Sequence, residues 1–368
     1  MNISEYNSYL LIDTALLAKN VRSILGKAPQ LIPVLKDDAY GLGAVPIAKA
    51  LCAFPEIKTF AVAHVSEGIE LRRAGIDRNI LVMGGVLPFQ IDAAVENGLT
   101  VALSRLGMAA ELSEAARKAG VRAKAQIKID TGLHRIGIDP SELNELIQEL
   151  NDAKEFLEIT GAFSHFSDAG NPERDKAEYG CFLAATEALR RAGIALPLRH
   201  MACSAAMEHS PQYALDAVRC GRRLYMDSPE MPSGEIAECV SWRGYITHVA
   251  RRNAGERIGY GKGCTLERDS IIATLSVGYG DGLNEACFTA GAPVLIGGKR
   301  CKLLSCCMDQ CMADVTGATC AVGSEVTFFG SDGCGGFLSA QEVASLIGAN
   351  EGCGLTSPLS PRVKRVYR

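Results

Sequence analysis

The chain has 368 residues and a formal net charge of −4. That is enough length for about two domains, and it shows no basic excess of the kind that nucleic-acid-binding proteins carry. No apolar run approaches the roughly 18 residues that cross a bilayer, and the N-terminus lacks the order of a signal peptide. These features predict a cytoplasmic protein, with the cytosolic domain of a membrane protein, whose membrane segment would precede Met1, as the alternative.

The fourteen cysteines do not form a metal-binding pattern. No CxxC pair occurs, and the densest cluster, Cys306, Cys307 and Cys311, has no histidine nearby, which argues against a zinc site. We therefore expect no metal centre and interpret the cysteines as reduced thiols, mostly packed as small hydrophobic residues.

Short apolar, β-branched runs alternate with helical patterns over the first two thirds of the chain. Several helical stretches, such as SEGIELRRAG and GMAAELSEAARKAG, end at glycine, as helix C-termini often do. Eight strands alternating with helices predict a (β/α)8 barrel over residues 1–235. The eight runs are LIPVLK (31–36), FAVAHV (60–65), ILVMGG (80–85), TVALS (100–104), AQIKID (125–130), ITGAFSHF (159–166), LPLRHMA (196–202) and YALDAVRCG (213–221).

The pattern changes after about residue 236. Short strands with glycine-rich turns replace the helices, for example in RGYITHVARRN, SIIATLSVGYGDGL and SEVTFFG. We therefore expect a mainly β domain over residues 236–368. One short helix is expected at 339–349, with Ser339 as its N-cap.

Polar residues follow the predicted barrel strands in a series. The C-terminal ends of barrel strands form the catalytic face of such folds. One polar residue at a strand end needs only solvent to explain it, whereas a series indicates a site. The residues are Lys36, His64, Lys128, Asp130, His165, Ser204 and Arg219.

Lys36 ends an apolar run, so it is either leaving the core for solvent or held there for chemistry. A lysine can form a Schiff base with an aldehyde cofactor such as pyridoxal 5'-phosphate (PLP). The loops CSAA (203–206) and CGRR (220–223) offer small residues, a hydroxyl and backbone N–H groups for a phosphate. Arg219 could partner a pyridine nitrogen. Such short motifs are also common in ordinary turns, so none is decisive alone.

Sequence blocks in order along nearly the whole chain resemble the alanine racemase family. VLKDDAYGLG (34–43) is similar to the family's PLP-lysine signature. The resemblance implies a PLP-binding barrel followed by a β domain. It also implies action on small L- and D-amino acids by a head-to-tail homodimer, in which the partner's β domain completes each active site. The other blocks are KIDTGLHRIG (128–137), SHF (164–166), HMACSAA (200–206), VRCGRRLY (218–225), IGYGKGCT (258–265), VGYGDG (277–282), CMDQCMADVT (307–316) and PRVKRVY (361–367).

The resemblance implies that racemisation uses two acid/base groups, one on each face of the substrate carbon. Lys36 would hold PLP and act as one of them, and Tyr260 of the second subunit would be the other. His165 and Arg219 would assist the tyrosine, because the ordinary tyrosine pKa of about 10 is high for a base. Arg219 would also face the pyridine nitrogen and keep it unprotonated, which disfavours side reactions such as transamination.

Further roles follow from the same resemblance. Arg135 would contact the cofactor's phenolic oxygen and the substrate carboxylate. Met308 and Asp309, again supplied by the second subunit, would line the substrate entrance. Lys128 matches a lysine that some relatives carry as a carbamate, with a plain ion pair to Asp130 as the alternative. The phosphate would be cradled by Tyr40, Ser204, Gly221 and Arg222.

Several positions depart from the family pattern. Cys203 and Cys220 stand where the family usually has Asn and Pro. Near the C-terminus, a Tyr–Glu pair is expected before the PRV block, and Asn350–Glu351 is its best counterpart, with Cys353 as an alternative match. Loss of the bulky phenol would enlarge the pocket, and Asn350 would offer a polar partner to a hydroxymethyl side chain.

This departure resembles the membrane-bound serine/alanine racemases that accompany vancomycin resistance and supply D-serine for modified peptidoglycan precursors. We therefore expect racemisation of both serine and alanine. The alternative is an ordinary alanine racemase that makes D-alanine for the cell wall. A PLP-dependent basic amino-acid decarboxylase is disfavoured because CMDQC (307–311) does not match its acidic, cysteine-centred site. A non-catalytic PLP carrier would end after the barrel.

Overall fold

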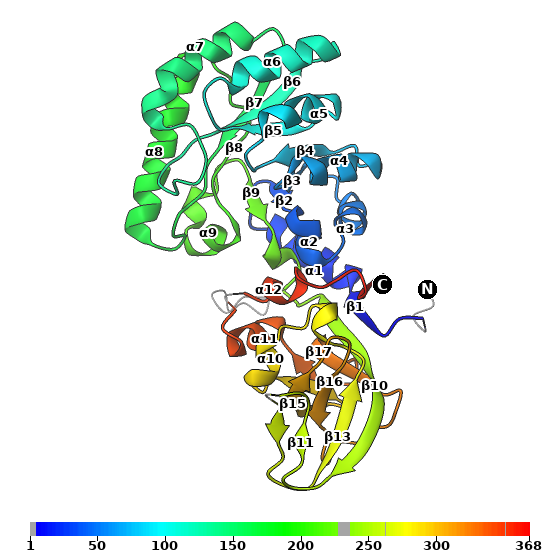
Figure 1. Ribbon diagram of the computed structural model, residues 1–368. Helices are drawn as coiled ribbons and strands as arrows, with labels where there is room; N and C mark the ends of the chain where they lie inside the picture. The colour runs from blue at the N-terminus through cyan, green and yellow to red at the C-terminus, as the bar shows by residue number, and fades with distance from the viewer. Residues whose placement is uncertain (1–4, 227–235, 262, 350) are drawn as a thin grey trace. The chain divides into compact units, whose positions relative to one another are not determined.

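The structure is a computed structural model that describes residues 5–226, 236–261, 263–349 and 351–368 (Figure 1). Its chain divides into two compact units. The barrel unit is formed by Val21–Ala39 and Gly43–Leu224, and the β unit by Met1–Asn20, Tyr40–Leu42 and Tyr225–Arg368. The domain boundary expected between residues 235 and 236 adjoins the segment 227–235, which is outside the described residues.

The barrel unit contains eight parallel strands within the described residues, and they coincide with the eight apolar runs. Strands buried on both faces read as continuous apolar runs, and Phe60, Ala61 and Val62 are fully buried. The strands are β2 (Leu31–Pro33), β3 (Thr59–Val62), β4 (Asn79–Val82), β5 (Thr100–Leu103), β6 (Ala123–Lys128), β7 (Leu157–Phe163), β8 (Arg199–His200) and β9 (Val218–Cys220).

Strand pairing closes the sheet into a barrel. Strands β3 to β8 pair in chain order, and β2 pairs in parallel with β9. The single bridges Val34↔Ala61 and Cys203↔Arg219 join these two groups on either side. The predicted (β/α)8 architecture is therefore confirmed.

Helices connect the strands and lie outside them, as Figure 1 shows for α3 to α8. Local signals fix their ends. Helix α8 begins with Asn171, whose side chain accepts from Arg174 N–H, and Pro172 occupies its first turn. Helix α6 ends at Gly120, which has a φ of 68°. The helices are α3 (Ala44–Leu51), α4 (Val65–Arg73), α5 (Ile91–Glu96), α6 (Met108–Ala119), α7 (Leu143–Ala153), α8 (Pro172–Arg191) and α9 (Ser204–His209), and α1 (Thr14–Leu25) has residues in both units.

The β unit is built on a nine-stranded sheet within the described residues, with the order β18-β17-β14-β15-β16-β13-β10-β1-β19. A small hairpin of β11 (Arg257–Ile258) and β12 (Cys264–Thr265) is separate from it. The predicted mainly β architecture is confirmed. The strands of the large sheet are β1 (Ser8–Ile12), β10 (Val240–Arg252), β13 (Ser270–Leu275), β14 (Pro293–Ile296), β15 (Lys299–Cys306), β16 (Cys311–Asp314), β17 (Glu325–Ser331), β18 (Phe337–Leu338) and β19 (Lys364–Tyr367).

The N-terminal strand β1 belongs to this sheet, although it falls within the range 1–235 that the sequence assigned to the barrel. It runs antiparallel to β10 and parallel to β19. The short helix expected at 339–349 is confirmed as α11 (Ala340–Leu346), where the Ser339 side chain accepts from Glu342 N–H. Helices α10 (Ala286–Thr289) and α12 (Cys353–Thr356) are single turns. In the described part of the chain, every helix is too short or too polar to span a bilayer.

Candidate active site

The barrel unit places the predicted site residues at one edge, where the parallel strands have their C-terminal ends. Lys36 follows Leu35, whose N–H donates to Ala61 O at 2.7 Å. Arg219 lies on β9 and pairs in register with Ile32 of β2. The remaining residues follow other strands: His64 after β3, Lys128 at the end of β6 with Asp130 just beyond it, His165 after β7, Ser204 after β8, and Gly221 and Arg222 after β9.

The chain forms a left-handed helical turn, α2 (Lys36–Gly41), directly after β2. Four consecutive residues that are not glycine have positive φ values: Asp37 (56°), Asp38 (51°), Ala39 (53°) and Tyr40 (60°). Each costs about 1–2 kcal/mol, so the turn costs on the order of 4–8 kcal/mol. Backbone strain of this kind persists only where the surroundings hold it, and it concentrates at functional sites.

Hydrogen bonds to the barrel unit hold the first part of this turn. The Asp38 carboxylate accepts from Ala44 N–H at 2.6 Å, at the start of α3. The Asp37 N–H donates to the Glu67 carboxylate at 2.5 Å. The turn therefore orients the backbone of Lys36 through contacts with two neighbouring helices.

A chain of buried hydrogen bonds crosses the centre of the site. His200 Nε2 contacts Gln126 Oε1 at 2.8 Å, and His200 Nδ1 accepts from Arg219 Nη1 at 2.7 Å. Arg219 Nη2 then donates to His165 Nδ1 at 2.9 Å. Arginine has donors only, so both Nδ1 atoms must be acceptors. Both histidines are therefore neutral, with the ring proton on Nε2.

Arg219 is a buried cation with neutral partners. Its side chain also donates to the carbonyl oxygens of Ser164 and Met201, and it lies 5.5 Å from the centroid of the Phe163 ring. Burial lowers its pKa to about 10, with the charge of Arg135 contributing. Among the described residues, no group accepts from its Nε–H, so this donor remains for a bound acceptor.

Positive charge is concentrated around His165. Burial and then the nearby charges of Arg219, Arg135, Lys128 and Lys36 lower the pKa of His165 to about 3. Burial, followed by Arg219, holds the pKa of His200 well below its ordinary range. A site with four cations near one neutral histidine favours an anionic ligand.

The two histidines predict a loss of stability in mild acid. Folding lowers the pKa values of both histidines. Above about pH 6.5 they are therefore neutral in the folded and the unfolded chain, and their contribution to the free energy of unfolding is fully present. As pH falls below about 6.5, the unfolded chain binds protons that the folded histidines refuse. The free energy of unfolding should fall by up to about 1.4 kcal/mol per pH unit for each histidine.

Chemical unfolding at a series of pH values between about 7 and 4 measures this slope. In His200→Asn, the amide oxygen can still accept from Arg219 but does not titrate, so the slope should become shallower. Equal slopes for the wild type and this variant would contradict the assignment. The carboxylates contribute equally to the pH dependence of unfolding in the wild type and in the variant, so the difference between the two slopes reports on His200.

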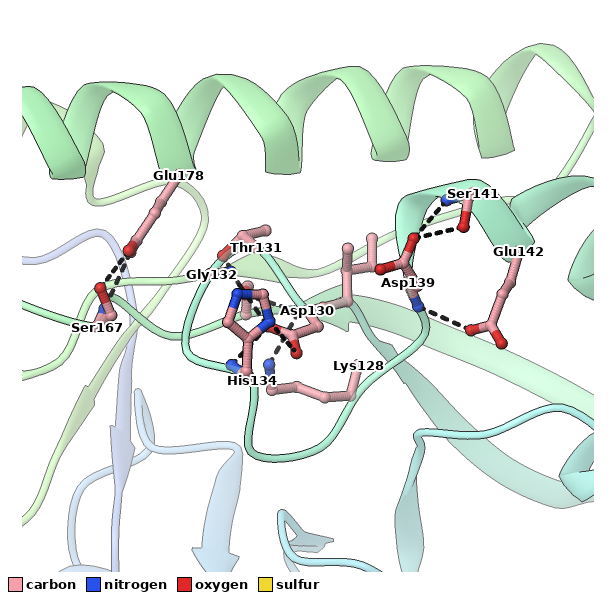
Figure 2. A network of polar contacts seen from close by, with 12 residues as sticks. Lys128, Asp130, Thr131, Gly132, His134, Asp139, Ser141, Glu142, Ser167 and Glu178 are labelled. Carbon is pink, nitrogen blue, oxygen red and sulfur yellow. Dashed lines mark hydrogen bonds and ion pairs between the residues drawn. The ribbon is translucent and has the colours of Figure 1, made fainter.

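The loop after β6 is ordered by Asp130, as Figure 2 shows. Its carboxylate accepts from Gly132 N–H at 3.1 Å and His134 N–H at 3.0 Å, and it lies 3.3 Å from His134 Nδ1. Lys128 is buried and donates to Ile129 O at 2.8 Å. The Asp130 carboxylate is thus partnered within its own loop by His134, and the simple Lys128–Asp130 ion pair weighed from the sequence does not form.

Lys128 has an altered ionisation. Burial, followed by the charge of Arg219, lowers its pKa to about 8. Arg135 follows on the same loop and is exposed. No group among the described residues forms a hydrogen bond or ion pair with the Arg135 side chain, yet its charge is close enough to lower the pKa values of His165 and Lys128. Arg135 is therefore available to an anionic ligand.

The loops proposed for phosphate binding follow β8 and β9. Ser204 begins α9, and its hydroxyl lies 3.2 Å from Cys220 Sγ. Burial raises the pKa of Cys220 to about 12, so its thiol stays protonated. Cys203 is the N-cap of α9 and makes no capping hydrogen bond through its side chain. Arg222 begins the 3₁₀ turn Arg222–Leu224.

Tyr260 lies in the β unit, between β11 and β12, and is 80% exposed. Glycines on both sides have positive φ values, 87° at Gly259 and 31° at Gly261. A Cβ on Gly259 would come within 1.9 Å of Ser305 Oγ, so glycine is required there for the close approach. The two flanking glycines thus place the Tyr260 side chain at the surface of the β unit.

Met308 and Asp309 lie on the turn between β15 and β16. Met308 is 55% exposed, and its carbonyl accepts from Gly280 N–H at 2.8 Å. A Cβ on Gly278 would lie 2.3 Å from that carbonyl oxygen, which explains the VGYGDG block. Asp309 pairs with Arg362 of the PRV block at 2.7 Å. Sequence blocks far apart therefore shape one surface of the β unit.

Two expectations concern the C-terminal departure. Asn350 lies outside the described residues. Cys353 begins α12, and its thiol lies 3.4 Å from Glu351 Oε2. The sequence did not identify His200 or Gln126 as site residues. His200 stood in a matched block and is the last residue of β8, whereas Gln126, buried inside β6, gave no local signal.

A (β/α)8 barrel with a cation-rich C-terminal edge, followed by a mainly β unit, defines a recognised class of two-domain enzyme fold. Residues 12–229 match the family model "Alanine racemase, N-terminal domain", and residues 239–367 match "Alanine racemase, C-terminal domain". The chain therefore belongs to the alanine racemase family, as its sequence blocks predicted.

Individual relatives support the same family assignment. The chain is 36% identical over 361 residues to an alanine racemase of Desulforamulus reducens, covering 95% of each protein. The solved structure of the alanine racemase of Streptomyces coelicolor A3(2) superposes with a TM-score of 0.92 at 30% identity, covering 98% of each chain. That of Clostridium difficile 630 gives 0.91 at 29% identity, covering 100% of this chain and 97% of the other.

Proposed function

We propose that this chain is a PLP-dependent racemase that interconverts L- and D-alanine. The observation that carries the proposal is the arrangement at the C-terminal edge of the barrel. There Lys36 follows the first barrel strand, and the hydrogen-bonded chain Gln126–His200–Arg219–His165, a cation with neutral partners, lies close enough for the charge of Lys36 to act on His165. Family membership supports the same reaction.

The residues fit PLP in three respects. Lys36 is an exposed amine at a strand end, suited to the aldehyde. Arg219 has a spare Nε–H donor, suited to a pyridine nitrogen. The cations around His165 suit the phosphate and the substrate carboxylate. PLP would be held by Lys36, Arg219 and Arg135, with Tyr40, Ser204, Gly221 and Arg222 at its phosphate.

When bound, PLP withdraws electrons from the substrate and so makes its Cα–H acidic enough to lose a proton. The chain must then hold and return that proton. Lys36 would serve one face of Cα, and Tyr260 of a second copy would serve the other. Arg135 would orient the substrate carboxylate. We therefore expect a homodimer in which Met308 and Asp309 of each copy line the other copy's substrate entrance.

We also propose that Lys128 is carbamylated. Carbamate formation requires a neutral amine, and the pKa of about 8 gives Lys128 a substantial neutral fraction near neutral pH. The resulting anion would sit near Arg135 and Arg219 and could fix the exposed Arg135 guanidinium. Mass spectrometry of the intact protein under carbon dioxide would detect this mass addition, and Lys128→Ala should lack it.

The deciding experiment is racemisation of a panel of small L-amino acids by the purified protein supplied with PLP. Chiral chromatography should show D-alanine forming from L-alanine. Carbon dioxide release from lysine or ornithine without racemisation would instead indicate the decarboxylase alternative. Absence of any PLP binding would overturn the proposal as a whole.

Serine use is the finer part of the prediction, and the relatives favour the ordinary alanine racemase. The relatives reported above are named alanine racemases, and their names give no support to the link with vancomycin resistance. The serine expectation depends on Asn350 alone. If Asn350 admits a hydroxymethyl group, Asn350→Tyr should lower kcat/KM for serine relative to alanine by about tenfold or more. An unchanged serine-to-alanine ratio would contradict the pocket argument.

A further inference from the structure

We propose that Glu67 is a positioning residue for Lys36. This inference rests on the proposed function of Lys36, but it comes from a contact that neither the sequence blocks nor the family likeness identified. Glu67 lies in the first turn of α4, after β3, and its carboxylate reaches the turn α2 that follows the neighbouring strand β2.

Three backbone N–H groups donate to this one carboxylate. Oε2 accepts from Ala63 at 2.7 Å and from His64 at 2.9 Å. These two bonds cap the start of α4, as a glutamate at this helix position commonly does. Oε1 accepts from Asp37 N–H at 2.5 Å. This bond plays no part in capping α4, because Asp37 belongs to α2. The third bond joins α4 to the residue directly after Lys36.

The strain of α2 makes this bond consequential. Asp37 is the first of four consecutive residues with positive φ, and an unrestrained chain would relax to the ordinary right-handed region. Relaxation of the backbone at Asp37 would change the orientation of the adjacent Lys36 side chain. The same carboxylate also binds the loop after β3. Glu67 therefore holds the start of α2 against the edge of the barrel.

Two substitutions separate the capping role from the positioning role. In Glu67→Gln, the single amide oxygen can keep the two capping bonds, but the NH₂ group then faces Asp37 N–H and cannot accept from it. Glu67→Asp keeps the charge on α4 but is one methylene too short to reach Asp37. The matched control is Glu70→Gln, which removes a carboxylate from the exposed side of the same helix.

The first readout needs no cofactor. In hydrogen-exchange mass spectrometry of the protein without PLP, Glu67→Gln should speed exchange in residues 36–41 about tenfold, corresponding to about 1.4 kcal/mol. Exchange in α4 should be unchanged. The second readout is the affinity for PLP, measured through the absorbance of the lysine-bound cofactor. This affinity should weaken about tenfold in Glu67→Gln, and kcat should also fall. Glu67→Asp should repeat both effects, and Glu70→Gln neither.

Unchanged exchange in residues 36–41 would overturn the proposal, as would equal acceleration in α4 and α2, which would mean that Glu67 only caps the helix. If the Gln variant does not fold, the Asp variant decides by the same two readouts. A wild-type protein that binds no PLP would refute the proposed function, while the exchange experiment would still decide whether Glu67 holds the turn.

Discussion

Replacing Lys36 with alanine is expected to abolish racemisation, lowering the rate by about 10⁴-fold or more. General acid–base catalysis alone contributes about 10²–10⁴-fold, and the substitution also removes the amine that would bind the aldehyde of PLP. The racemase rate and the absorbance of lysine-bound PLP should therefore disappear together. The measurements are chiral chromatography of alanine and a spectrum after removal of free cofactor.

The control for this substitution is Lys49→Ala, since Lys49 is an exposed lysine on α3 of the same unit. It should retain the rate and the spectrum of the wild type. If Lys36→Ala kept both, the chemistry would belong to another lysine, and buried Lys128, with its lowered pKa, would be the next candidate. Unfolding curves should show that Lys36→Ala remains folded, because Lys36 is exposed.

The barrel could be predicted because its signal is local. Each parallel strand is buried on both faces and reads as an apolar run, and the polar residues that follow these runs meet at one edge. Lys36, His165 and Arg219 were found in this way. The likeness to the family then supplied their roles, along with the importance of Tyr260, whose local sequence shows only a glycine-rich turn.

Other features depend on contacts that no local pattern records. The left-handed turn α2 contains no glycine before Gly41, so its conformation follows from contacts such as that of Glu67. The pairing of β1 with β10 joins residues more than 200 positions apart. The bond between Gln126 and His200 likewise crosses the barrel interior. Long-range pairing decides these features.

Replacing Tyr260 with phenylalanine is expected to lower racemisation by about 10²–10⁴-fold while leaving PLP bound. Phenylalanine keeps the ring but lacks the hydroxyl that would carry a proton on one face of Cα. Lys36 remains, so the proton on the other face can still be exchanged. In heavy water, the variant should incorporate deuterium into one enantiomer of alanine and not into the other.

Nuclear magnetic resonance of each enantiomer incubated separately measures this asymmetry, and the lysine-bound PLP absorbance confirms that the cofactor site is intact. Tyr245→Phe is the matched control, because Tyr245 also lies in the β unit, on β10, where its ring centroid is 6.3 Å from that of Tyr9. Loss of exchange with both enantiomers would mean that Tyr260 does more than serve one face. Continued racemisation in both directions would refute the two-base assignment and would leave the glycines around Tyr260 without a catalytic explanation.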